Sequence, residues 1–220
     1  MKQEIRLTKK VFVLGAGGHA KVVIDALRKM EISIDGVIAR EYSDQTTRSC
    51  AGVPLVGNDS FLTQLDSQEV LLANGIGHLP NQKNIRKRMF NIGKSLGFRF
   101  ITVVHPSAII ADSVSLGEGC QVLAGAIIQA DANIADNVII NTRATIEHDV
   151  QVSNHVTVSP GAILCGGAKL AECCYIGAGA IVLQTFSVGT GSVIAASSVV
   201  AKDIPENVVL MGAKPSINPI

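Results

Sequence analysis

The sequence predicts two successive folds, a small α/β domain over residues 1–100 and a parallel β-helix over residues 101–220. Two observations predict the β-helix. An aliphatic residue returns at every sixth position, and four positions after each aliphatic residue comes a small or β-branched one, with Phe186 as the exception. A third observation predicts the α/β domain, because an apolar strand, a glycine-rich turn and an amphipathic helix succeed one another between residues 11 and 30.

The six-residue period begins at Val104 and continues without a gap to Val200. This period differs from the 3.6-residue period of an α-helix and from the two-residue alternation of a plain strand. It fits a short strand followed by a tight corner, repeated many times. The aliphatic residue points inward and the small residue fills the corner, which is the hexapeptide repeat of a parallel β-helix.

The first half reads as the start of a βαβ arrangement. Residues 11–15 form a buried strand candidate, Gly15–Ala20 a glycine turn, and residues 21–30 an amphipathic helix. Two further strand candidates lie at 33–39 and 69–77. The G-x-G-x-x-A pattern that begins at Gly15 favours a loop whose backbone amides approach a phosphate at a helix N-terminus.

Three interpretations of the glycine turn are open: an NAD site, a purely structural turn, and a site for another phosphate-bearing ligand. An NAD site would place an acid at the end of the second strand to bind the ribose. That end carries Ala39 and Arg40, and Asp35 lies early in the strand. The sequence therefore favours a phosphate-bearing ligand other than NAD.

Charge and cysteine usage narrow the class of protein. Nineteen Lys and Arg against eighteen Asp and Glu give a net charge of +1, so no strong field attracts nucleic acid or a membrane surface. The five cysteines form no CxxC pair and read as reduced thiols. The first ten residues are charged and lack the apolar core of a signal peptide, and the apolar runs are too short to span a bilayer. We expect a cytoplasmic protein that binds neither nucleic acid nor membranes.

The two halves together resemble the bacterial sugar acetyltransferases of the hexapeptide-repeat class, which comprise nucleotide-4-aminosugar N-acetyltransferases and sialic acid O-acetyltransferases. The resemblance rests on the segments VFVLGAGGHAKVVIDAL, GVPLVG, NTRATIEHDVQV, VSPGAIL and IGAGAIVLQ. It implies a Rossmann-like α/β domain that binds a nucleotide-linked sugar, and a left-handed β-helix of three strands per coil that binds acetyl-CoA. It also implies a homotrimer with active sites in the grooves between chains.

The resemblance implies that acetyl passes directly from acetyl-CoA to the 4-amino group of a nucleotide-linked amino-deoxysugar. The nearest alternative is O-acetylation of sialic acid or a related sugar by the same machinery. The Glu-His-Asp sequence favours the amine, since a carboxylate beside the histidine recurs in the aminosugar enzymes. An alternative from a different class is a non-catalytic scaffold whose coils only mediate assembly.

His148 is the candidate general base and Asp149 the acid beside it. His148 lies two positions after Ile146 and therefore sits at a corner of the coil. A histidine of near-neutral pKa suits removal of a proton from an attacking amine, and a neighbouring carboxylate fixes its tautomer. Backbone amides near Gly161 or Gly166 are candidate oxyanion donors. The alternative is a solvated corner histidine with no chemical role.

The remaining candidate residues form two groups implied by the resemblance. The substrate group is Gly15, Gly17, Gly18, His19, Asn141 and Thr142. The acetyl-CoA group is Thr157, Gly161, Gly166, Gly179 and Lys202. Relatives meet the phosphates of CoA where Lys202 and Lys214 lie, although two lysines there also fit a solvated end of the coil.

Three other side chains leave alternatives open. Thr157 occupies the position at which relatives carry a histidine, so either Thr157 or His155 is a candidate contact of the acetyl group. Cys165 is a candidate acyl carrier, but nothing nearby in the sequence lowers its pKa. A zinc site needs three protein ligands, and His148 and His155 have no convincing third. We therefore expect no metal.

Overall fold

The computed structural model describes residues 9–40, 48–80 and 84–212. The chain divides into two compact units. The first extends to Pro106 and also contains Gly117–Gln121, whereas the second consists of Ser107–Leu116 and the residues from Val122 onward. The sequence placed the domain boundary at residue 100, and the first compact unit runs beyond it and includes a segment of the first coil.

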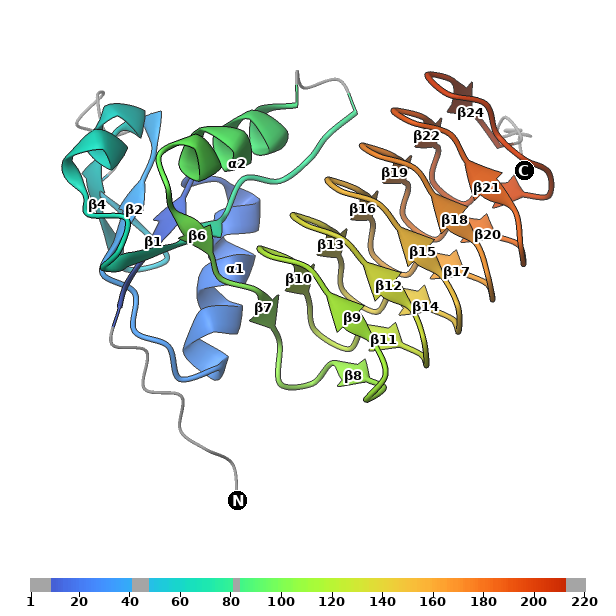
Figure 1. The fold of residues 1–220 in the computed structure, drawn as a ribbon, viewed down its shortest axis with the longest axis horizontal. Helices are drawn as coiled ribbons and strands as arrows, with labels where there is room; N and C mark the ends of the chain where they lie inside the picture. Colours follow the sequence, from blue (N-terminus) through green and yellow to red (C-terminus); the bar gives the residue numbers. More distant parts are fainter. Residues whose placement is uncertain (1–8, 41–47, 81–83, 213–220) are drawn as a thin grey trace, which may run out of the picture. The chain divides into compact units, whose positions relative to one another are not determined.

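The first unit is built on one sheet with the strand order β3-β4-β2-β1-β5-β6 (Figure 1). All neighbours are parallel except β3, which is antiparallel to β4. Because β1 pairs with β2 on one side and with β5 on the other, the order reverses between β1 and β5. The strands are β1 (Lys10–Leu14), β2 (Gly36–Ile38), β3 (Ser49–Cys50), β4 (Val53–Gly57), β5 (Val70–Asn74) and β6 (Arg99–Phe100), with β7 (Val103–Val104) after them.

Helices cover both faces of this sheet, because successive side chains of a strand point to opposite faces. Val11 and Val13 of β1 pack into a core with apolar residues of α1. Phe12 and Leu14 pack into a second core, with residues of η2 and α2. The helices are α1 (Gly18–Lys29), the 3₁₀ helix η2 (Asp59–Gln64) and α2 (Ile85–Ser95). None of the helices in the described ranges is long and apolar enough to cross a bilayer.

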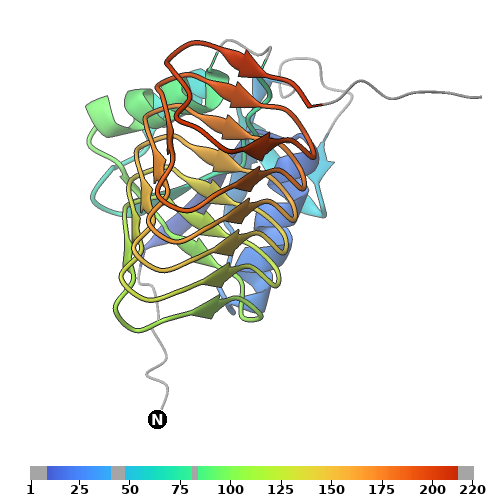
Figure 2. The ribbon, with the colours of Figure 1, turned by 90° about the vertical axis from the view of Figure 1, so that its right-hand side faces the viewer.

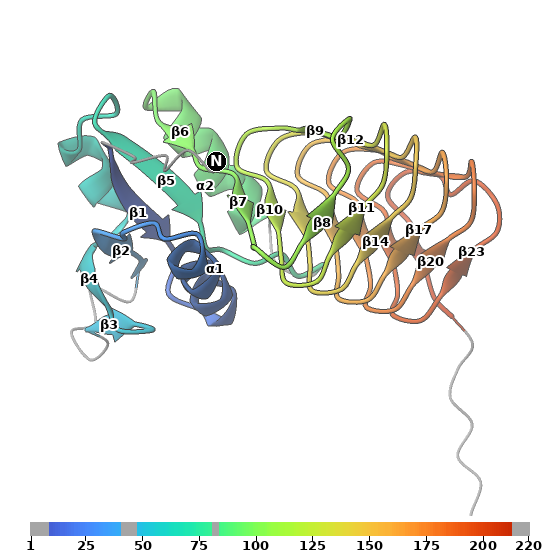
Figure 3. The same cartoon turned by 90° about the horizontal axis from the view of Figure 1, so that it is seen from below.

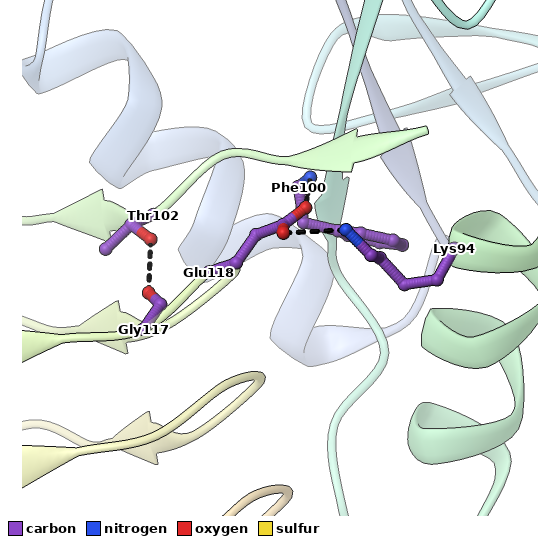
Figure 4. Close-up of polar contacts among 5 residues, drawn as sticks. All are labelled: Lys94, Phe100, Thr102, Gly117 and Glu118. Atoms are coloured by element: carbon purple, nitrogen blue, oxygen red, sulfur yellow. Dashed lines mark hydrogen bonds and ion pairs between the residues drawn. The ribbon is translucent and has the colours of Figure 1, made fainter. Parts of the chain in front are cut away.

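One carboxylate explains why residues 117–121 belong to the first unit (Figure 4). Glu118 Oε1 accepts a hydrogen bond from the backbone N–H of Phe100 at 2.7 Å, and Glu118 Oε2 accepts one from Lys94 Nζ at 2.7 Å. The hydroxyl of Thr102 donates to the carbonyl of Gly117 at 2.8 Å. Charge-assisted hydrogen bonds are the stronger kind, so this segment is held to both α2 and β6.

The second unit is a parallel β-helix of two-residue strands (Figures 1 and 2). Strands pair with the strand eighteen residues later, as Thr145 does with Ile163, except that the last pair joins Val193 to Val209, sixteen residues later. The strands make three faces, and Figure 3 shows the strands of one of them, which we call face 1, side by side.

The bounds of the strands follow face by face. Face 1 contains β8 (Ile109–Ile110), β11 (Ile127–Ile128), β14 (Thr145–Ile146), β17 (Ile163–Leu164), β20 (Ile181–Val182) and β23 (Val199–Val200). Face 2 contains β9 (Ser115–Leu116), β12 (Asn133–Ile134), β15 (Gln151–Val152), β18 (Lys169–Leu170) and β21 (Ser187–Val188). Face 3 contains β7, β10 (Gln121–Val122), β13 (Ile139–Ile140), β16 (Thr157–Val158), β19 (Tyr175–Ile176), β22 (Val193–Ile194) and β24 (Val209–Leu210).

The corners follow the same six-residue period as the strands. From residue 119 to residue 197, every sixth residue has a φ between 56° and 70°, the left-handed region. Glycine adopts this region freely and Asp or Asn tolerate it, and these types occupy most of the positions. The aliphatic series is buried from Val122 to Val200, whereas its first members, Val104, Ile110 and Leu116, are partly exposed. The hexapeptide repeat predicted from the sequence is therefore confirmed.

Candidate active site

His148 and Asp149 are the two turn residues of the corner between β14 and β15. Asp149 has a φ of 61°, and its Oδ2 lies 2.7 Å from His148 Nδ1. An ionised carboxylate oxygen only accepts, so Nδ1 carries the proton and Nε2 keeps its lone pair when the ring is neutral. The pKa of His148 is raised above 6.5, chiefly by this hydrogen bond and further by the charges of Asp149 and Glu147.

The opposite edge of the His148 ring lies over Gly166 in the next coil. A Cβ on Gly166 would lie 2.7 Å from both Cε1 and Nε2 of His148, well inside normal non-bonded contact. Gly166 is not among the glycines of positive φ, so its backbone does not require glycine. The absence of a side chain at Gly166 therefore provides the room in which the imidazole lies.

A second corner, between face 3 and face 1, contains four of the predicted residues. The side-chain oxygen of Asn141 accepts a hydrogen bond from the backbone N–H of Thr142 at 2.8 Å. Gly161 and Gly179 occupy the same corner in the next two coils, with φ of 67° and 65°. The N–H of Gly161 donates to the carbonyl of Thr142 at 3.0 Å, which engages that amide within the stack.

Face 1 separates these two corners and presents a row of β-branched side chains. We call this set the β-branched row: Ile109, Ile127, Thr145, Ile163, Ile181 and Val199. Ile109 is 65% exposed, Val199 53% and Ile163 36%. The corresponding outward positions of face 2 carry Ser115, Asn133, Gln151, Lys169 and Ser187. Ile127, Thr145 and Ile181 are partly exposed, and Thr145 is the one polar member of the row. A largely apolar row that reaches the surface is typical of an interaction surface.

The other predicted residues of the coil lie elsewhere. Thr157 is only 3% exposed and belongs to face 3. His155 lies at the corner between faces 2 and 3, where its Nδ1 is 2.9 Å from Asn137 Nδ2. Lys202 is exposed near the end of the coil, and Lys214 lies outside the described residues. Across the described ranges, no three His, Cys, Asp or Glu side chains gather as a metal site would require.

The glycine turn of the first unit lies where the sheet order reverses. Gly15–His19 follow β1, and Gly75–His78 follow its neighbour β5, which ends at Asn74. Ligands of open α/β sheets bind outside the carboxyl ends of the strands at this switch point. A Cβ on Gly17 or on Gly18 would meet nothing within 4 Å, so open space surrounds the start of α1. The first N–H groups of a helix favour an anion there.

Asp35 does not occupy this switch point as a ribose ligand would. Its Oδ2 accepts a hydrogen bond from the backbone N–H of Val11 at 2.8 Å, and its own N–H donates to the carbonyl of Val11. The Asp35 carboxylate thus holds the start of β2 against β1. This geometry weakens the NAD interpretation of the glycine turn further.

Three polar side chains that were not predicted from the sequence, Asn74, Arg86 and Gln121, lie next to the predicted residue His19. His19 Nε2 is 2.7 Å from Gln121 Oε1, and Gln121 Nε2 donates to the carbonyl of Asn74 at 2.7 Å. Arg86 Nη1 donates to the carbonyls of Asn74 and Ile76, both at 2.8 Å. Asn74, Arg86 and Gln121 are at most 3% exposed. A polar residue that ends the apolar strand VLLAN was a signal for Asn74, whereas nothing in the repeat distinguishes Gln121.

Comparisons with known proteins agree with this arrangement. Residues 10–92 match the family described as the PglD N-terminal domain. UDP-N-acetylbacillosamine N-acetyltransferase of Bacillus subtilis is 36% identical over 119 residues, which are 53% of this chain and 52% of that protein. The match thus spans about half the length of that curated relative.

Solved structures are similar over nearly the whole chain. A histidine-to-alanine variant of GDP-perosamine N-acetyltransferase from Caulobacter crescentus, in complex with CoA and GDP-perosamine, has a TM-score of 0.85 and 34% identity, covering 92% of this chain and 93% of that one. The acetyltransferase domain of PglB from Neisseria gonorrhoeae, in complex with acetyl coenzyme A, has a TM-score of 0.84 and 33% identity, covering 95% and 100%. The predicted fold class, a Rossmann-like α/β domain followed by a left-handed parallel β-helix, is confirmed.

The contact between His148 and Gly166 predicts the effect of one added methyl group. In Gly166→Ala the imidazole must rotate away, so its bond to Asp149 weakens and the pKa of His148 falls toward 6.5. An NMR titration of the histidine ring protons measures this pKa. Gly18→Ala, where the new methyl meets nothing within 4 Å, is the control and leaves the pKa unchanged. An unaltered His148 titration in Gly166→Ala would contradict the assigned ring position.

Proposed function

We propose that this chain, which belongs to the hexapeptide-repeat sugar N-acetyltransferase family, transfers acetyl from acetyl-CoA to the 4-amino group of a nucleotide-linked amino-deoxysugar. The observation that carries the proposal is the His148–Asp149 pair, held at one corner by a 2.7 Å hydrogen bond and by the room over Gly166. Support for the two substrates comes from the relatives, one solved with CoA and GDP-perosamine and one with acetyl coenzyme A.

The chemistry assigned to His148 follows from its tautomer. The sugar amine attacks the thioester carbonyl, and His148 Nε2 takes the proton that the nitrogen loses as the C–N bond forms. The C–S bond then breaks, the thiolate of CoA leaves, and the proton on the imidazolium passes to it or to solvent. Asp149 stabilises the imidazolium through the Nδ1 hydrogen bond and keeps Nε2 directed away from itself.

We assign the oxyanion contact, the sugar contacts and the path of acetyl-CoA to the two corners that border face 1. Because the N–H of Gly161 is engaged with Thr142, we assign the oxyanion contact to the backbone at Gly166, which lies against the base. Asn141 and Thr142 are assigned to the sugar, and Gly161 and Gly179 to the path of acetyl-CoA along the opposite edge. Thr157 and Lys202 stay predicted contacts of the cofactor.

We assign the β-branched row to the interface of a homotrimer. A single coil stack offers flat faces, and the base at its edge gains a wall only when a second copy covers the adjacent face. The second copy is the occupant that fits best, because the row is apolar except for Thr145 and is bordered by the candidate catalytic corner. The polar face 2 is assigned to solvent.

Acetyl transfer is tested with UDP-, dTDP- and GDP-linked 4-aminosugars and free sialic acids, by following thiol release from acetyl-CoA. We expect turnover of a nucleotide 4-aminosugar, and a loss of about 10²- to 10⁴-fold in His148→Ala with the oligomer intact, because the base is gone. His105→Ala, a histidine outside the predicted site, is the matched control. Turnover confined to sialic acid would assign O-acetylation instead, and full activity of His148→Ala would remove His148 from the chemistry.

The pKa of His148 predicts the shape of the pH profile. The base must be deprotonated, so kcat/KM rises with pH through the pKa of His148, which its neighbours hold above 6.5. Asp149→Asn removes the main cause of that increase, so the rising limb moves to lower pH while the maximal rate falls about 10- to 100-fold.

Glu147→Gln is the control for this profile. This variant removes only the Glu147 charge, which is the smallest of the effects that raise the pKa of His148. The rising limb of its kcat/KM profile therefore moves less than that of Asp149→Asn. Equal shifts in the two variants, or an unmoved limb in Asp149→Asn, would show that the profile reports another group.

The trimer assignment is tested on the β-branched row. Ile163→Lys places a charge at the centre of the proposed interface, and a buried unpaired charge costs several kcal/mol, so the variant dissociates and loses activity. Light scattering after gel filtration measures the mass. Gln151→Lys places the same charge on face 2 and leaves the mass unchanged. An intact trimer in Ile163→Lys would contradict the assignment.

A further inference from the structure

A chain of buried hydrogen bonds connects the start of α1 with the end of β5. It runs from His19 to Gln121, from Gln121 to the carbonyl of Asn74, and from that carbonyl to Arg86. All four residues belong to the first unit, and Gln121 is the first residue of β10. The acetyl transfer assigned above uses none of these contacts except through His19.

The direction of every bond in this chain follows from one group. The carbonyl of Asn74 only accepts, so the Gln121 atom 2.7 Å from it is the amide nitrogen, and the other amide atom is the oxygen. That oxygen also only accepts, so His19 Nε2, 2.7 Å away, carries the hydrogen. In a neutral ring the other nitrogen, Nδ1, then has a bare lone pair.

The environment keeps the His19 ring neutral. Burial and the charge of Arg86 lower the pKa of His19 to about 4, against the opposing effect of the hydrogen bond to Gln121. The imidazole at the glycine turn is therefore not a cation at neutral pH. The backbone of His19 lies against the segment that follows β5, because a Cβ on Gly77 would lie 3.2 Å from His19 Cβ.

We propose that Gln121 is a positioning residue of the nucleotide-sugar site: it holds His19 as the Nε2–H tautomer, so that Nδ1 accepts a hydrogen bond from a hydroxyl or N–H group of the ligand. The identity of the ligand as a nucleotide-linked sugar rests on the proposed function. A phosphate oxygen is itself an acceptor and gains nothing from a bare Nδ1. The diphosphate is thus assigned to the backbone N–H groups at Gly17 and Gly18, and His19 recognises a donor beside it.

The same network anchors the opposite wall of the switch point. Asn74 presents one carbonyl to two donors, Gln121 and Arg86, and Arg86 also bonds the carbonyl of Ile76. Replacing Gln121 by an apolar side chain of similar length removes an acceptor from His19 and a donor from Asn74 together. The His19 ring then has no fixed partner for Nε2, and its tautomer redistributes.

The tautomer is measured directly by ¹⁵N NMR of the histidine ring nitrogens in the full chain. We expect wild-type His19 to show a protonated Nε2 and an unprotonated Nδ1 from pH 5.5 to 8, and Gln121→Met to show a mixture. Gln151→Met makes the same change at an exposed position of β15 and is the control. A protonated Nδ1 in the wild type would overturn the inference, whether or not the chain is an active acetyltransferase.

Binding is measured by calorimetry with UDP-glucose, dTDP-glucose and GDP-mannose, without acetyl-CoA. We expect Gln121→Met to weaken the bound ligand about tenfold, and wild-type affinity to stay constant from pH 5.5 to 8. His19→Asn, which keeps an oxygen near the place of Nδ1, retains affinity within about threefold, whereas His19→Gln, which keeps only the Nε2 place, loses about tenfold. The assignment would be overturned if the wild type bound none of the three probes, or if Gln121→Met bound the probe as tightly as the wild type does.

Neither measurement requires turnover. An absence of acetyl transfer would therefore contradict the proposed reaction, whereas the NMR and binding measurements would still decide the role of Gln121. If Gln121→Met does not fold, the wild-type spectrum and the two His19 variants still decide the tautomer and its use. In an active enzyme the substitution is expected to raise KM for the nucleotide sugar and leave kcat nearly unchanged, since Gln121 touches no reacting atom.

Discussion

From residue 119 to residue 197, every corner of the coil has one residue in the left-handed region of backbone space, and the catalytic proposal depends on that constraint. At the corner between β14 and β15 the residue is Asp149, a type that tolerates this conformation. The residue before it is His148, whose Nδ1 reaches the adjacent carboxylate at 2.7 Å without any long-range contact. The repeat thereby supplies a histidine–carboxylate pair from consecutive residues, and the next coil has only to leave room for the ring at Gly166.

Two histidines in the chain show how environment sets opposite protonation behaviour in one residue type. His148 is 65% exposed beside a carboxylate, which raises its pKa, whereas burial and Arg86 lower the pKa of His19 to about 4. In both rings a single acceptor fixes the tautomer, Asp149 at Nδ1 of His148 and Gln121 at Nε2 of His19. The free nitrogen is then a base in one ring and a hydrogen-bond acceptor in the other.

The period of the sequence was sufficient to predict the coil and the corner position of His148, because both are properties of neighbouring residues. The glycine turn likewise predicted that a helix follows β1, although α1 begins at Gly18, inside the turn, and not at residue 21. Gln121 was missed, because its partner His19 lies 102 positions away and its place in the repeat is an ordinary outward one. Burial of Thr157 was missed for the same reason, since the period assigns the direction of a side chain along a strand but not what covers it.

Glycine illustrates why a residue letter alone does not determine a role. Gly161 and Gly179 have positive φ and meet the demand of the corner itself. Gly166 has no such demand, and its missing side chain admits the imidazole of His148. Gly17 and Gly18 have neither a positive φ nor a side chain packed over them. They leave open space at the N-terminus of a helix, where an anion can bind. The sequence could assign all five glycines to binding. Only the structure shows which glycines the backbone conformation requires, which one makes room for a catalytic ring, and which ones leave access for a ligand.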